Sequence, residues 1–216
     1  MVEIIPSILT SDPNELRALI SRCEGVVERV SIDIIDGKFA ANKTIDPTVL
    51  SAIDTNLKLD FQLMVIEPVN WIEKCVSAGA DRIIGHIEHM TSQTEFIGKV
   101  QEVGAQIGLG LDLETPVDKL DPLILTNLDV VLVMSVPAGF GGQEFSPKVI
   151  TKIEKLDKIR KRDATPYKIH VDGGITFDRI DDVRLAGADE VSIGRWLFDG
   201  DLSQNIEKFT KAADKK

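Results

Sequence analysis

The segment 135–143 constrains the fold more than any other part of this chain, because it joins an apolar run to a helical pattern through a cluster of glycines. The apolar run is 128–134, and the helical pattern begins at Pro147. Glycine loses much conformational entropy on folding and offers no side chain for packing. Its repeated use here indicates that backbone N–H groups approach a ligand closely, and at a strand-to-helix turn the usual ligand is a phosphate. The glycines are Gly139, Gly141 and Gly142.

Two more glycine turns follow apolar runs in the last third of the chain. Gly173 and Gly174 follow Asp172 after the run 167–171, and Gly194 precedes Arg195 after the last such run. A single turn of this kind is typical of an ordinary loop. Three of them, each after a β-branched run, favour a shared phosphate site at one end of a parallel sheet.

Short runs rich in Val, Ile and Leu alternate with segments of helical periodicity along the whole chain. The predicted strands are 3–9, 29–34, 58–65, 82–87, 106–112, 129–134, 167–171 and 190–193. The predicted helices are 14–21, 47–53, 68–77, 93–102, 116–125, 147–161, 177–185 and 202–213. Four of these helices begin at proline, and three are followed by a Gly-Ala pair, which are the positions where helices tolerate those residues.

Eight strands with helices between them predict an α/β fold, a single (βα)8 TIM barrel with a parallel eight-stranded sheet. The barrel would span residues 1–216 as one domain, a length that suits this fold. The rival is an open, doubly wound sheet, which carries a glycine-rich turn after its first strand. Here the first run ends in the segment 6–9, Pro-Ser-Ile-Leu, which disfavours that alternative.

Composition excludes several classes of function. The formal net charge of −10 gives no electrostatic support for binding nucleic acid or an anionic membrane. An apolar run of about 18 residues, as a membrane span requires, is not found in the sequence, and neither is a signal peptide. Cys23 follows one predicted helix and Cys75 lies in another, without metal-ligand spacing, which indicates free thiols in a reducing cytosol. We therefore expect a cytoplasmic protein.

Polar residues stand at the carboxyl ends of the predicted strands, where barrels of this class carry their chemistry. Asp33 and Asp172 come from strands far apart in the sequence, and both would point inward. Two opposed carboxylates suit a reaction in which a proton leaves one face of a carbon and returns to the other. The alternative for each residue is an aspartate that caps the following turn. His170 would face the same way as Asp172, either as a core histidine or as its partner.

Four segments then establish a resemblance that runs through nearly the whole chain in order. They are Ile5-Pro6-Ser7-Ile8-Leu9, the run from Ile32 to Phe39, the run from Met134 to Gln143, and Val171-Asp172-Gly173-Gly174. Together they resemble the ribulose-phosphate 3-epimerase family. The resemblance implies a TIM barrel that interconverts ribulose 5-phosphate and xylulose 5-phosphate by inversion at C3, with Asp33 and Asp172 as the two acid-base residues. It also implies a phosphorylated sugar as the partner molecule.

The resemblance assigns further residues to substrate binding. Ser7 matches a serine that contacts substrate, Met64 and Met134 match methionines that line the pocket, and His86 matches a histidine of the pocket wall. Together with the glycine turns, the candidate substrate-binding residues are Ser7, Gln62, Met64, His86, Met134, Gly139, Gly141, Gly142, Gly173, Gly174, Gly194 and Arg195.

The chain departs from the family at the metal site. The family holds a divalent metal with two histidines and the two aspartates, but the histidine positions are Ser31 and Gln62 here. We expect the degenerate set of Ser31, Asp33, Gln62 and Asp172 to hold no Zn or Fe, because those ions prefer nitrogen and sulfur ligands. No tightly bound cofactor is predicted, although two carboxylates could attract Mg²⁺ or Mn²⁺. Lys38 is either a replacement cation or a solvated loop lysine.

Three functions remain open from the sequence. The first is a sugar-phosphate epimerase or isomerase, and the second is a catalytically silent or metal-independent phosphosugar-binding barrel with a regulatory or other role. The third is the aldol or decarboxylase branch of phosphate-binding barrels, which usually places a lysine between paired aspartates; the segment 33–36 has none. The two acids favour the epimerase. Barrels of this kind often assemble through apolar helix faces, so we also expect a homo-oligomer.

Overall fold

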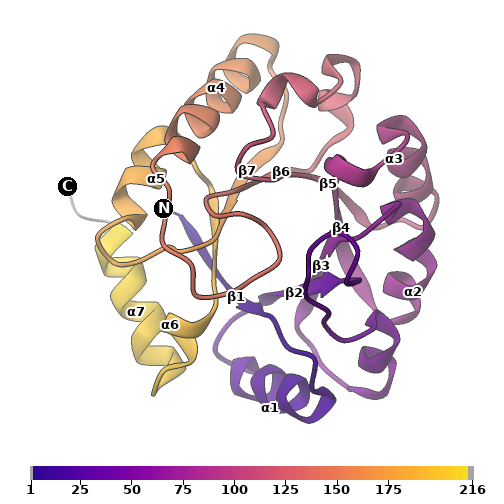
Figure 1. The fold of residues 1–216 in the computed structure, drawn as a ribbon. Helices are drawn as coiled ribbons and strands as arrows, with labels where there is room; N and C mark the ends of the chain where they lie inside the picture. The colour runs from indigo at the N-terminus through magenta and orange to yellow at the C-terminus, as the bar shows by residue number, and fades with distance from the viewer. Residues whose placement is uncertain (1, 214–216) are drawn as a thin grey trace.

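The computed structural model describes residues 2–213. Eight parallel strands close into a barrel in sequence order, with β1 paired to β8, as predicted for a TIM barrel. Figure 1 looks into the barrel, with the helices around its outside. The strands are β1 (Glu3–Ile8), β2 (Arg29–Ile35), β3 (Lys58–Met64), β4 (Ala80–His86), β5 (Gln106–Leu111), β6 (Val130–Met134), β7 (Lys168–Asp172) and β8 (Glu190–Ile193).

The connections between strands are helical, but they are less regular than predicted. The α-helices are α1 (Pro13–Cys23), α2 (Ile72–Ser77), α3 (Gln93–Glu102), α4 (Lys148–Asp163), α5 (Ile180–Ala186), α6 (Arg195–Phe198) and α7 (Leu202–Ala213). The 3₁₀ turns are η1 (Pro47–Ala52), η2 (Pro68–Trp71), η3 (Ile87–His89), η4 (Val117–Lys119) and η5 (Pro122–Asn127).

Two predicted α-helices are 3₁₀ turns instead. The segment predicted at 47–53 forms η1, in which the Ile53 N–H donates to the Leu50 carbonyl at 2.8 Å, an i→i+3 bond. The segment predicted at 116–125 splits into η4 and η5, because Pro122 lies inside it and has no N–H to continue a helix.

Local sequence signals define the regular helices. Asp12 caps α1 by accepting from the Asn14 N–H at 2.8 Å, directly before Pro13 in the first turn. Gly187 ends α5 at φ 116°, and a Cβ there would lie 2.8 Å from Asp157 of α4. Only glycine combines that backbone conformation with so close an approach, so this helix stops where β8 must begin.

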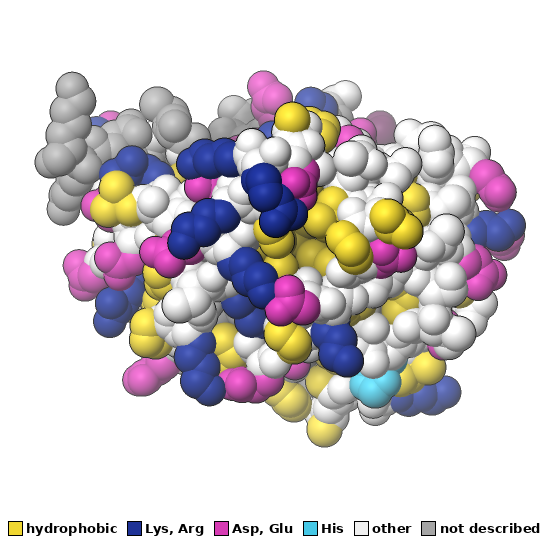
Figure 2. Space-filling model, turned by 90° about the horizontal axis from the view of Figure 1, so that it is seen from above, with side chains coloured by type: hydrophobic (Ala, Val, Ile, Leu, Met, Phe, Trp, Pro, Cys, Tyr) yellow, Lys and Arg dark blue, Asp and Glu magenta, His cyan; other side chains and the backbone are white. Residues whose placement is uncertain are grey.

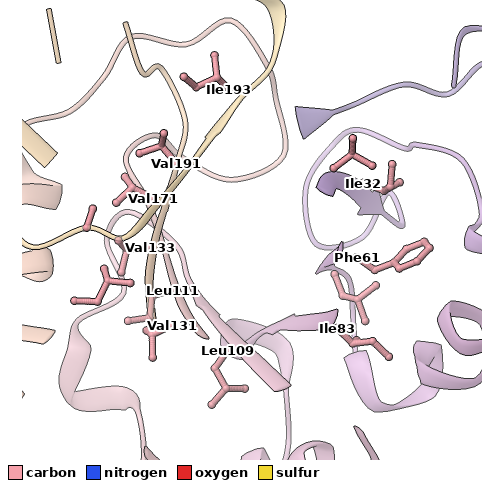
Figure 3. Close-up of a cluster of buried hydrophobic side chains, with 14 of the residues drawn as sticks. Ile32, Phe61, Ile83, Leu109, Leu111, Val131, Val133, Val171, Val191 and Ile193 are labelled. Carbon is pink, nitrogen blue, oxygen red and sulfur yellow. The ribbon is translucent and has the colours of Figure 1, made fainter. Parts of the chain in front are cut away.

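The main hydrophobic core lies between the sheet and the helices. Alternate strand residues point outward to it, including those labelled in Figure 3: Ile32, Phe61, Ile83, Leu109, Leu111, Val131, Val133, Val171, Val191 and Ile193. Helices contribute buried residues from one face each, such as Leu16 of α1, Ile153 of α4 and Phe209 of α7. This apolar layer positions the strands, and it leaves the inward-facing residues available for other roles.

Two groups of inward-facing residues carry polar side chains, one group at each end of the strands, and a small apolar cluster that includes Ile84, Val130 and Leu132 also lies inside the barrel. We call Ser7, Asp33, Met64, Met134, Asp172 and Ser192 the carboxyl-end group, because they line the cavity at the carboxyl ends of the strands. We call Arg29, Asp60, Arg82, Lys168 and Glu190 the amino-end group, because they occupy the amino-terminal halves of their strands. His170 of β7 lies between the two groups.

The surface over α4 carries charges of both signs. Seen from above, Lys and Arg side chains gather there with Asp and Glu among them (Figure 2). Several basic residues of α4 form ion pairs, including Lys148 with Glu114 and Lys155 with Asp118. Within residues 2–213, none of the helices combines the length and apolar character that a membrane crossing requires.

Candidate active site

A cavity of about 810 Å³ opens at the carboxyl ends of the strands. It is lined by side chains that the sequence singled out and by the three glycine turns. The predicted residues on its wall are Ser7, Asp33, Met64, Met134, Gly139, Gly141, Gly142, Asp172, Gly173, Gly174, Gly194 and Arg195. A cavity of this size and depth is typical of small-molecule sites, and barrels of this class place such sites at this end.

Asp33 and Asp172 reach this cavity from β2 and β7, which are separated in the barrel by β1 and β8. Both side chains are almost fully buried, with exposed fractions of 4% for Asp33 and 8% for Asp172. The Ser7 hydroxyl donates a hydrogen bond to Asp33 Oδ2 at 3.1 Å. The other carboxylate oxygen, Asp33 Oδ1, has no protein partner.

The environment of the two carboxylates favours their protonated forms. Burial raises the pKa of Asp33 well above its ordinary value, the nearby charge of Asp172 raises it further, and the Ser7 hydrogen bond opposes both effects. Burial also raises the pKa of Asp172, against the opposing influence of His170 and Gln62. Two acids that share a buried site ionise one after the other, so between the two ionisations one is charged and the other neutral.

Gln62 and His86 lie behind the cavity wall rather than on it. Both are fully buried, and Gln62 Nε2 lies 3.2 Å from His86 Nε2 and 3.2 Å from Met134 Sδ. His86 Nδ1 in turn lies 3.3 Å from Glu88 Oε2. These contacts let Glu88 and His86 orient the Gln62 amide, which lowers the pKa of Asp172 by hydrogen bonding.

The glycine turns give backbone access to the cavity where side chains would block it. Gly142, Gly173 and Gly174 all have positive φ, and a Cβ on Gly174 would lie 2.5 Å from the Phe145 nitrogen. Arg195 is the cation among the residues that line the cavity, and its Nη1 would lie 3.5 Å from a Cβ on Gly142. Backbone N–H groups beside one guanidinium make an arrangement that suits an anion.

The loop after β6 is fixed over the barrel by contacts with two other loops. Asp112 Oδ1 accepts from the Ala138 N–H at 2.8 Å, and the Asn42 amide donates to the Gly139 carbonyl at 2.7 Å. A Cβ on Gly139 would lie only 2.3 Å from the Ala40 Cβ. Gly139 therefore permits a close contact between two loops, a structural role in addition to its place on the cavity wall.

Lys38 matches one of its two predicted roles, whereas Ser192 was not predicted to line the cavity. Lys38 is exposed, does not line the cavity, and contributes its backbone N–H to Asp36 Oδ1 at 2.7 Å, so it is a solvated loop lysine. Ser192 does line the cavity, but the sequence pattern predicted only that it lies in the strand 190–193. Counting back by two from Gly194 along β8 would have placed Ser192 and Glu190 on the inward face.

The residues at the family's metal positions do not fit an ion held by imidazoles. Ser31 Oγ and Gln62 Oε1 are buried oxygens without a protein partner, and Asp33 and Asp172 supply the remaining oxygens. Zn and Fe prefer nitrogen and sulfur, whereas an all-oxygen set suits only hard cations such as Mg²⁺ or Mn²⁺. Among residues 2–213, no three His, Cys, Asp or Glu side chains are grouped to hold a metal ion.

Comparison with known proteins identifies the family. The model of the ribulose-phosphate 3 epimerase family matches residues 3–198. The ribulose-phosphate 3-epimerase of Synechocystis sp. is 36% identical over 203 residues, covering 91% of this chain and 87% of the relative. That of Treponema pallidum is 34% identical over 213 residues, covering 97% of both chains.

Solved structures share the fold at much lower identity. A 3-hexulose-6-phosphate synthase superposes with a TM-score of 0.66 at 13% identity, covering 98% of both chains. Phosphoribosyl anthranilate isomerase from Thermus thermophilus gives a TM-score of 0.62 at 13% identity, again covering 98% of both chains. These likenesses confirm the fold alone. On the matches to sequence relatives, the chain belongs to the ribulose-phosphate 3-epimerase family, whose members are isomerases that act on sugar phosphates.

Proposed function

We propose that this protein interconverts ribulose 5-phosphate and xylulose 5-phosphate by inversion at C3, with Asp33 and Asp172 as the acid-base pair. One observation carries the proposal: two buried carboxylates from β2 and β7 line the same cavity, and each has a pKa raised by its surroundings. Groups with perturbed pKa values in a cleft are candidates for catalysis. The relatives' names supply the substrate, and the glycine turns with Arg195 supply a place for its phosphate.

The two carboxylates exchange protons with the substrate in sequence. Ionised Asp33 removes the proton from C3, and the C–H electron pair forms a C2–C3 double bond while the C2 oxygen takes the negative charge. Neutral Asp172 then delivers its proton to the opposite face of C3, and the electrons return to the C2 carbonyl. The product carries the inverted centre, Asp33 has gained one proton and Asp172 has lost one, so the site is then set for the reverse direction.

Binding of the phosphate fixes the position of the substrate for these steps. Backbone donors at Gly142, Gly174 and Gly194 with the guanidinium of Arg195 form an anion site beside the two acids. Binding energy from a non-reacting phosphate then fixes C3 between the carboxylates, which lowers the entropic part of the barrier. We assign no step to a metal, because the donor set does not match the imidazole-containing site of the family.

Proton exchange in D₂O tests this function directly. We expect deuterium to enter C3 of ribulose 5-phosphate when the protein is present, and xylulose 5-phosphate to form at a comparable rate. The assay is run with and without added Mn²⁺, since stimulation would show that a hard cation occupies the oxygen set. If ribulose 5-phosphate binds without any exchange under either condition, the protein is a silent phosphosugar-binding barrel and the proposal is wrong.

We also propose a cytoplasmic location and association between copies. Leu123 and Leu185 are large apolar side chains with exposed fractions of 84% and 70%, and contact between copies could cover them. Sedimentation equilibrium gives the mass of the assembly, and a mass of one chain would contradict the predicted homo-oligomer.

A further inference from the structure

Ser192 belongs to a buried relay of three side chains that the proposed mechanism does not use. Its hydroxyl oxygen lies 2.8 Å from His170 Nε2, and His170 Nδ1 lies 3.3 Å from Glu190 Oε2. All three side chains are at most 1% exposed, yet Ser192 also forms part of the cavity wall. The relay therefore connects the cavity to the interior of the barrel.

Glu190 is the fixed end of this relay. Arg82 Nη2 lies 2.8 Å from Glu190 Oε2, and Lys168 Nζ lies 2.6 Å from Glu190 Oε1. Burial alone would raise the pKa of Glu190, but contacts with His170 and Arg82 hold it far below the ordinary value. Glu190 is therefore a carboxylate, which accepts hydrogen bonds and donates none.

The carboxylate determines how His170 and Ser192 are oriented. The proton is assigned to His170 Nδ1, because that nitrogen faces the Glu190 carboxylate, which can only accept, and this leaves Nε2 as the acceptor. The Ser192 hydroxyl consequently donates its proton to Nε2. Its oxygen lone pairs remain free on the cavity side, where they can accept a hydrogen bond from a ligand hydroxyl.

The position of Ser192 indicates which hydroxyl that is. Ser192 is in β8, two residues before Gly194, and its Cα partner on β7 is Asp172. A substrate that extends from the glycine turns to the aspartates must therefore pass Ser192. In a pentulose 5-phosphate that reacts at C3, only C4 lies between the phosphate-bearing carbon and the reacting carbon, and its single polar group is a hydroxyl.

We propose that Ser192 is a further substrate-binding residue that accepts a hydrogen bond from the C4 hydroxyl, and that His170 and Glu190 are the positioning residues that orient it. The inference rests on the proposed function for the identity of the substrate. The relay would then contribute to substrate specificity. A ligand with no hydroxyl at C4 leaves the free lone pairs of the Ser192 oxygen without a hydrogen-bond donor, and such a site binds that ligand more weakly.

The test compares two ligands that cannot react. Ribitol 5-phosphate has no carbonyl and is therefore inert, and its 4-deoxy analogue differs only by the hydroxyl in question. By calorimetry we expect the wild-type protein to bind the 4-deoxy analogue about tenfold more weakly. The Ser192→Ala variant should bind both ligands within about twofold of each other, because the partner of the hydroxyl is gone.

Two His170 variants separate positioning from packing. His170→Gln keeps an oxygen acceptor for the Ser192 hydroxyl and should retain most of the discrimination, whereas His170→Leu should lose it. Thr165→Val is the control, because Thr165 is a buried hydroxyl residue outside the cavity and its loss should leave the tenfold discrimination intact.

Equal binding of the two ligands by the wild-type protein would overturn the proposal, and so would wild-type discrimination in Ser192→Ala. Neither result depends on turnover. Failure of the proposed epimerase function appears separately, as the absence of deuterium exchange at C3 in the wild-type protein.

Discussion

The two ends of the barrel interior both bury carboxylates, but only the carboxylates at the amino-terminal end have cationic side chains as partners. In the amino-end group, Glu190 contacts Arg82 and Lys168, and Asp60 forms ion pairs with Arg82 and Arg29. In the carboxyl-end group, Asp33 accepts a hydrogen bond from a serine and faces another acid. Paired carboxylates stabilise the fold as charges, whereas an acid held without a cation is available to exchange protons.

The pKa directions follow this difference. The pKa of Glu190 is lowered by its partners, and that of Asp33 is raised by burial and by Asp172. At Asp60 the cations compensate for burial only in part. Burial raises the pKa of Asp60 by more than the charges of Arg82 and Arg29 lower it. Burial therefore disfavours charge at both ends, and only the cations of the amino-end group compensate for it.

The largest expected effect is on catalysis. Replacing either acid, as Asp33→Asn or Asp172→Asn, should lower C3 exchange in D₂O by about 10³-fold, within the range that a positioned acid or base contributes. Asp178→Asn, at an exposed position, serves as the control and should retain full exchange. An Asp33→Asn variant with more than a tenth of wild-type exchange would show that this carboxylate is not the base.

Breaking the amino-end group should instead cost stability. Arg82→Met leaves Asp60 and Glu190 buried with fewer cationic partners, so the free energy of unfolding should fall by about 3–5 kcal/mol. Arg162 pairs with Asp163 at the surface, and Arg162→Met should change that free energy by less than about 1 kcal/mol. Urea denaturation measures both. Similar losses for the two variants would mean that the buried network contributes no more than a surface pair.

A gain of metal binding tests the expectation that Ser31 and Gln62 give the carboxyl-end group little affinity for Zn or Fe. Ser31→His with Gln62→His adds two imidazoles beside Asp33 and Asp172, so Zn²⁺ affinity should rise at least about tenfold and more than the two single changes together. Elemental analysis of the wild-type protein should find no stoichiometric Zn or Fe. One equivalent of either metal in the wild-type protein would show that oxygen ligands suffice.

The sequence predicted the barrel because each level of pattern agreed: strand periodicity, proline at helix starts, and glycine at helix ends. It placed Asp33 and Asp172 correctly on inward faces, because alternation along a strand needs only a register. It could not place Gln62 and His86 behind the cavity wall, since depth within a barrel depends on how neighbouring strands are staggered. It also missed the role of Ser192, whose partners come from two different strands.

The smallest expected effect is on the pH dependence of stability, which should have opposite signs at the two ends of the barrel. The folded-state pKa of Asp33 lies above its ordinary value of 3.8, so the wild-type protein loses stability as pH rises through the raised pKa. Asp33→Asn removes this loss and should increase the free energy of unfolding by about 1 kcal/mol at neutral pH, raising Tm by about 2–4 °C. The gain should vanish below about pH 4, where the wild-type carboxyl is protonated in both states.

Glu190→Gln is the matched change at the other end, and its sign should be reversed. The folded-state pKa of Glu190 lies below the ordinary value of 4.5, so its charge contributes stability above that pH and loses it as pH falls. This variant should be less stable than wild type at neutral pH, with a difference that shrinks on acidification. Thermal unfolding from about pH 2 to pH 8 measures both variants, because both differences change below about pH 4.5. If Asp33→Asn were also less stable than wild type at neutral pH, the Asp33 carboxylate would be paired like those of the amino-end group, and the contrast between the two ends would be wrong.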